Sequence, residues 1–106
     1  MKQLQIVPKP GFNLYGALVD REVQHRRKAR GTFYRVGRKE KDQARWAHST
    51  YPGWVKIARG MGEVVLAEIH TRAEPELEWR LFQAFLGFLD RHFRENLAAV
   101  NIQFSL

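Results

Sequence analysis

Positively charged side chains in this sequence gather in one stretch, where they could bind an anionic partner. Between Arg21 and Arg45 there are ten lysines and arginines but only three acidic residues. That stretch accounts for the whole formal charge of +7, because the other eight basic and eight acidic residues cancel. A local basic field attracts phosphates and other anions, although a solvated helix face followed by a solvated loop is an equally good explanation.

Aromatic residues are interleaved with these cations in the middle of the chain. Flat rings stack on unpaired bases, while lysine and arginine bind phosphate. A surface that carries both kinds of side chain can therefore hold single-stranded RNA or DNA. The candidates for stacking and phosphate binding are Phe33, Arg35, Arg45, Trp54 and Lys56. Three arginines at the start of the stretch would widen its basic edge: Arg26, Arg27 and Arg30.

A histidine and a carboxylate are weaker, catalytic candidates. His70 and Glu68 are two residues apart, so in a strand they lie on the same face. The histidine could take a proton from a ribose hydroxyl while an arginine steadies the phosphate, which is the chemistry of a metal-free ribonuclease. The sequence has no cysteine and no two histidines at helical i, i+4 spacing. It therefore predicts no thiolate, metal or cofactor site.

The elements that must position these residues are predicted by hydrophobic periodicity and turn signals. Strands are expected over 3–7, 32–37, 44–49, 54–59, 63–71 and 98–105, and helices over 13–29 and 75–95. The order β-α-β-β-β-β-α-β predicts a single α+β domain spanning residues 1–106. In such a domain, two helices cover one face of a mostly antiparallel sheet.

The turns between the middle strands predict which side chains share a face. They place Trp46 opposite both Val36 and Ile57, and Ile57 opposite Val65. One face then becomes almost wholly apolar, so we expect the helices to cover it. The opposite face is expected to be open and to carry Phe33, Arg35, Arg45, Trp54, Lys56, Glu68 and His70.

Three functions are compatible with that open face. The favoured one is a non-enzymatic module that binds single-stranded nucleic acid, RNA more readily than DNA. The second is a dimeric domain that binds a cationic or apolar small molecule, with Glu68 fixing a cation and Trp54 stacking on it. The third is the metal-free ribonuclease. A homodimer is expected, with an interface formed by exposed apolar residues of the face: Phe33, Trp54, Val64 and Leu66.

The expected compartment is the cytoplasm. No apolar run approaches the roughly 20 residues that cross a bilayer. The first residues lack the apolar core of a secretory signal. The sequence therefore predicts a soluble protein without a membrane partner.

Overall fold

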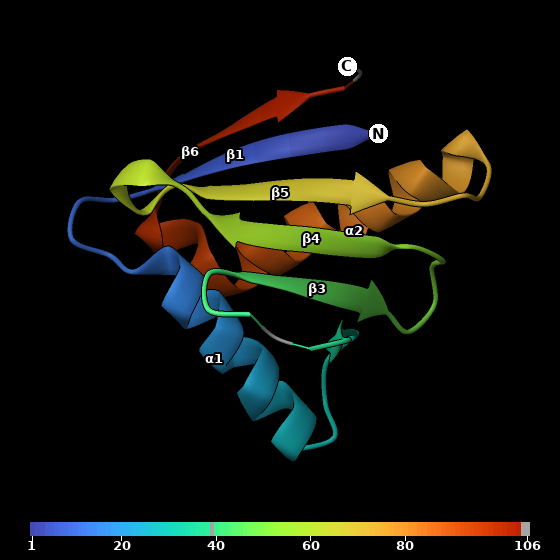
Figure 1. The fold of residues 1–106 in the computed structure, drawn as a ribbon, viewed down its shortest axis with the longest axis horizontal. Coiled ribbons are helices and arrows are strands. Elements are labelled where there is room, and N and C mark those ends of the chain that lie inside the picture. Colours follow the sequence, from blue (N-terminus) through green and yellow to red (C-terminus); the bar gives the residue numbers. More distant parts are fainter. Residues whose placement is uncertain (39, 105–106) are drawn as a thin grey trace.

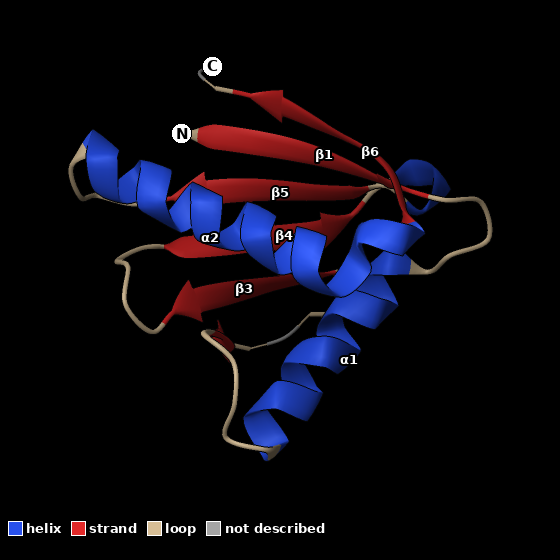
Figure 2. Cartoon of the chain, turned by 180° about the vertical axis from the view of Figure 1, so that it is seen from behind, coloured by secondary structure: helices blue, strands red, loops and turns tan. Residues whose placement is uncertain are grey.

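Six strands form one antiparallel sheet, and both helices lie on the same side of it (Figures 1 and 2). The computed structural model describes residues 1–38 and 40–104, so the predicted strand end at residue 105 lies outside the described residues. The strands, in the sheet order β2-β3-β4-β5-β1-β6, are β2 (Phe33–Val36), β3 (Gln43–His48), β4 (Trp54–Arg59), β5 (Val65–His70), β1 (Lys2–Pro8) and β6 (Leu97–Gln103). The helices are α1 (Leu14–Arg27) and α2 (Pro75–Phe93). The predicted α+β class and element order are confirmed.

Both helices begin where their capping residues predict. The side chain of Asn13 accepts a hydrogen bond from the backbone N–H of Gly16 at 3.1 Å, which caps α1. Pro75 occupies the first turn of α2, followed by Glu76 and Glu78, whose charges suit the positive end of the helix dipole. The inner side of α2 is apolar and aromatic, and its buried residues are Leu81, Phe82, Phe85, Phe88, Leu89 and Phe93.

The core lies between the helices and the inner face of the sheet. Trp46 is at its centre, with ring centroids 6.4 Å from Phe85 and 5.4 Å from Phe88. In the middle strands Trp46 pairs with Val55, and Ile57 pairs with Ala67. Both pairings differ from the predicted ones by two residues. A two-residue shift leaves every side chain on its predicted face, because the side-chain period of a strand is two.

Strand β2 is paired one residue away from the predicted register. Val36 lies opposite Arg45 instead of Trp46. A one-residue shift turns the whole strand over. Phe33 and Arg35 therefore belong to the side that faces the helices, and the prediction that they lie on the open face is wrong.

The aromatic pair at the start of β2 gives the physical reason for this register. Phe33 is only 4% exposed and packs edge-on against Phe85, whereas Tyr34 is 44% exposed on the other side. The predicted register would have buried the Tyr34 hydroxyl, which then needs a hydrogen-bond partner. Phenylalanine fills the same space without that cost.

Three histidines lie in surroundings that favour their neutral form. Burial is the main cause that lowers the pKa of His25, His48 and His92. The rings of His25 on α1 and His92 on α2 lie 5.1 Å apart, and the charge of Arg21 lowers both pKa values further.

We expect the melting temperature to fall as the pH is lowered from about 7 to about 5. A histidine whose pKa is lowered by folding binds a proton more readily in the unfolded chain. Its contribution to stability is therefore complete above the unfolded pKa of about 6.5 and is lost as the pH falls toward the folded value. Thermal melts measure this, and a His25→Gln/His92→Gln variant should show a smaller fall. A melting temperature that is constant over the range would contradict the prediction.

Candidate functional site

The side of the sheet that faces away from the helices, here called the open face, is built from alternate residues of all six strands (Figure 1). Paired residues form three rows across the strands. The first row is Tyr34, Ala47, Trp54 and His70. The second row is Val36, Arg45, Lys56, Glu68, Gln3 and Gln103. The third row is Gln43, Ala58, Leu66, Gln5 and Asn101.

Trp54 is the aromatic centre of the open face. Its ring stacks on that of His70, with centroids 5.2 Å apart and planes inclined by 12°. The guanidinium of Arg45 lies over the Trp54 ring, 5.7 Å from its centroid. Of these two neighbours of Trp54, Arg45 is more mobile than His70, because its guanidinium is attached to a long aliphatic chain. A planar ligand that stacks on Trp54 would therefore displace Arg45 rather than His70.

Glu68 places a carboxylate in the middle of the same face. Its Oε1 lies 2.9 Å from Nε2 of His70, and its Oε2 accepts a hydrogen bond from the side-chain amide of Gln3 at 3.2 Å. The hydrogen bond with His70 is the main cause that lowers the pKa of Glu68; the Gln3 amide and the charge of Lys56 add to it, while burial opposes them. The Glu68 carboxylate is therefore ionised at neutral pH.

A basic hollow of about 270 Å³ lies at the end of the open face formed by β2, β3 and β4. Three cations line it, Arg38, Arg45 and Lys56, together with Glu40. Neither Arg45 nor Lys56 forms an ion pair with another residue in the part of the chain that the structure describes. Their charges are therefore available to an anion, and phosphate is the anion that such groups commonly bind.

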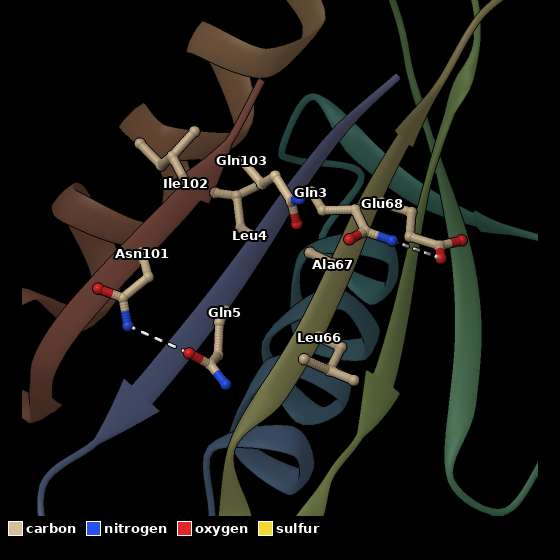
Figure 3. A pocket seen from close by; sticks show the side chains of 9 residues that line it. All are labelled: Gln3, Leu4, Gln5, Leu66, Ala67, Glu68, Asn101, Ile102 and Gln103. Atoms are coloured by element: carbon tan, nitrogen blue, oxygen red, sulfur yellow. Dashed lines mark hydrogen bonds between the residues drawn. The ribbon is translucent and has the colours of Figure 1, made fainter. Parts of the chain in front are cut away.

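An amide hollow of about 310 Å³ lies across β5, β1 and β6 (Figure 3). Glu68 and Leu66 line one side of it, and four residues with side-chain amides are also part of its lining: Gln3, Gln5, Asn101 and Gln103. The amide of Asn101 donates to Gln5 Oε1 at 3.2 Å. Carboxamides both donate and accept hydrogen bonds, so the hollow suits a ligand with a polar, planar edge.

Sequence reasoning did not find the amide hollow. Gln3 and Gln5 alternate in β1, and Asn101 and Gln103 alternate in β6, at opposite ends of the chain. Only the long-range pairing of β1 with β6 and β5 brings them together. The signal in the sequence was the same i, i+2 spacing of amides in both terminal strands.

Lys56 and Glu68 join the two hollows. They lie directly opposite each other on β4 and β5, and Lys56 lines the basic hollow while Glu68 lines the amide hollow. Neighbouring strands are about 4.8 Å apart. Cationic groups that can bind phosphate and groups that can pair with a base edge therefore lie side by side.

The structure brings together only some of the residues predicted from the sequence. Five of them share the open face: Arg45, Trp54, Lys56, Glu68 and His70. The other predicted arginines do not join them: Arg26 and Arg27 lie at the end of α1, and Arg30 follows it. That helix end projects past the β2 edge on the helix side of the sheet (Figures 1 and 2). Arg26 also pairs with the buried carboxylate of Glu22 at 3.3 Å.

Comparison with known proteins gives no further guide to the site. No protein-family model, curated protein or solved structure matches the chain. Within residues 1–38 and 40–104, no group of three or more histidine, aspartate or glutamate side chains could hold a metal ion. Neither described helix combines the length and the apolar character needed to cross a membrane.

Proposed function

We propose that the protein binds single-stranded nucleic acid on the open face, RNA more readily than DNA, as a non-enzymatic module of the cytoplasm. One observation carries the proposal: a basic hollow and an amide hollow adjoin on the sheet face that points away from both helices (Figures 1 and 2). Cations bind the phosphates, and amides pair with the exposed edges of unpaired bases. The ribose 2′-hydroxyl both donates and accepts hydrogen bonds, which gives the amides a further partner in RNA.

Stacking of a base on Trp54 is expected to be stronger than the contact it replaces. The Arg45 guanidinium over the ring contributes about 0.5–1 kcal/mol at an exposed site. A base stacked on an aromatic ring contributes about 1–3 kcal/mol. The base therefore displaces Arg45, which is then free to bind the adjacent phosphate. Tyr34, in the same row as Trp54, offers a second exposed ring.

Tryptophan fluorescence tests this proposal. The chain has three tryptophans. Trp46 is buried, Trp79 lies on α2, and Trp54 alone of the three lies on the open face. Single-stranded RNA at about 50 mM salt should quench the emission of the wild type and of Trp79→Phe. Trp54→Phe should lose most of the quenching. Quenching that survives in Trp54→Phe, or no binding at this salt concentration, would contradict the proposal.

A ribonuclease is the second candidate, because His70 and Glu68 form a hydrogen-bonded pair on the same face. Glu68 would orient the ring, and Nδ1 of His70 would take the proton from a ribose hydroxyl. Two features make catalysis by His70 less favourable. Nδ1 is the nitrogen of the imidazole ring nearer the backbone, and Trp54 covers one face of that ring, so a substrate has less access to Nδ1. RNA recovered intact from the titration favours binding alone. Shortened RNA that is absent with His70→Ala would favour the ribonuclease.

The homodimer expected from the sequence remains a proposal. Not all of the apolar residues expected at its interface are exposed. Of the expected interface, Phe33 is buried, whereas Leu66 is exposed on the open face. Other exposed apolar side chains gather where α2 meets the edge of the sheet: Trp79, Ile102 and Phe104. Size-exclusion chromatography of the titrated sample measures whether two copies associate.

A further inference from the structure

We infer that the amide hollow takes a guanine base, which gives the face a base preference; this inference rests on the proposed function. The decisive feature is the Glu68 carboxylate, which lines the amide hollow. A negative charge at the centre of a face that binds phosphates repels the ligand's backbone. That repulsion is offset when the ligand presents hydrogen-bond donors to the carboxylate.

Guanine presents the donors that a carboxylate requires. Its Watson–Crick edge has two neighbouring donors, N1–H and N2–H, followed by the O6 acceptor. An ionised carboxylate only accepts hydrogen bonds, and its two oxygens match a pair of parallel donors. Adenine, cytosine and uracil each place an acceptor beside their donor. In those bases an acceptor would face the negative charge of Glu68.

The contacts around Glu68 leave room for this pairing. Each carboxylate oxygen now has one partner: Oε1 lies 2.9 Å from Nε2 of His70, and Oε2 accepts a hydrogen bond from the Gln3 amide at 3.2 Å. Each carboxylate oxygen can accept more than one hydrogen bond, and Gln3 is a mobile side chain that can turn aside. Gln3 and Gln103 follow Glu68 in the same cross-strand row. Gln3 is about one strand spacing from Glu68 (~4.8 Å), and Gln103 is one strand further along the row. An amide N–H from Gln3, or from the long side chain of Gln103, can therefore donate to O6.

The groups around the hollow suit the rest of a guanosine nucleotide. Leu66, which is 47% exposed, offers an apolar surface to the plane of the base. On the other side of Glu68, Lys56 lines the basic hollow. The phosphate next to the bound base therefore meets a cation while the base edge meets the acid.

Oligonucleotides that differ at one base test the inference. We expect a uridine strand with one central guanine to bind roughly tenfold or more tighter than the same strand with adenine. Inosine lacks the N2 amino group, so its strand should bind with an affinity between these two. In Glu68→Gln the guanine preference should fall to about twofold or less. Anisotropy of the labelled strand measures all of these affinities.

A matched variant separates base recognition from net charge. Glu76→Gln changes the charge by the same amount but alters an exposed residue of α2, where Glu76 pairs with Arg80 at 3.6 Å. It should keep the guanine preference. Gln103→Ala is a second test, since it should weaken the preference without removing the hydrogen bond between His70 and Glu68. Circular dichroism and melts establish that each variant folds.

The outcomes distinguish failure of the guanine site from failure of the proposed binding of single strands. Equal affinity for all three strands overturns the guanine site and leaves strand binding in place. A guanine preference that survives in Glu68→Gln places the recognition elsewhere and also overturns the site. No binding of any strand overturns the proposed function as well. Guanosine monophosphate that binds as tightly as the strand, with the same loss in Glu68→Gln, supports the site but overturns strand binding, because the ligand is then a free nucleotide.

Discussion

Replacing Phe33 with alanine should lower the free energy of unfolding by about 3–5 kcal/mol. The Phe33 ring is almost fully buried, with its centroid 5.9 Å from that of Phe85 and 5.7 Å from that of Phe88. Removing it leaves a cavity between β2 and α2. The neighbouring Tyr34 is 44% exposed, so Tyr34→Ala should change the same free energy by only about 0.5 kcal/mol.

Urea denaturation of the two variants measures this difference, and thermal melts offer a second readout. The melting temperature of Phe33→Ala should fall by more than about 10 °C. Tyr34→Ala is a matched control, because it removes an aromatic ring from the next position of the same strand. Greater damage from Tyr34→Ala would mean that β2 has the register predicted from the turn, with Phe33 on the open face.

The elements of the fold could be predicted from the sequence because their signals are local. The aromatic stripe after Pro75 repeats with helical spacing, and α2 follows it closely. Alternation in β3, β4 and β5 places each side chain on the correct face even though the pairings differ by two residues. Alternation alone could not predict the register of β2, because each of the two registers buries one aromatic residue, either Phe33 or Tyr34. Only the packing of Phe33 under α2 decides between them.

The candidate site was harder to predict, since it depends on contacts between distant parts of the chain. Trp54 and Lys56 were found because neighbouring strands fix their face. The amides of β1 and β6 were missed, because no turn joins those strands to each other or to β5. The direction of α1 across the sheet also has no local signal. The sequence therefore predicted three arginines at the edge of the open face that the structure places farther from it: Arg26, Arg27 and Arg30.

Neutralising two cations of the basic hollow should strongly weaken the binding of RNA. Arg45→Gln/Lys56→Gln removes two charges that form no ion pair with any other described residue. Each phosphate contact adds about 0.7 to the salt dependence of binding to a single strand, so the slope of log K against log salt should fall by about 1.4. The affinity at about 0.1 M salt should fall roughly 10–30-fold.

A second pair of cations offers a control of equal charge. Arg27→Gln/Lys28→Gln also removes two positive charges, but at the end of α1 on the helix side of the sheet (Figure 2), and it leaves the pair between Arg26 and the buried Glu22 in place. The long-range field changes to a similar extent in both variants, whereas only the first loses groups that line the basic hollow. The α1 variant should therefore keep most of the affinity and nearly all of the salt slope.

The most direct measurement is a titration of a labelled single-stranded RNA with the wild type and both double variants at about 50 and about 200 mM salt. We predict that the wild type binds and weakens steeply with salt, that the α1 variant behaves similarly, and that Arg45→Gln/Lys56→Gln loses both affinity and slope. Equal losses in the two variants, or no binding by the wild type at the lower salt concentration, would contradict a nucleic-acid interface on the open face.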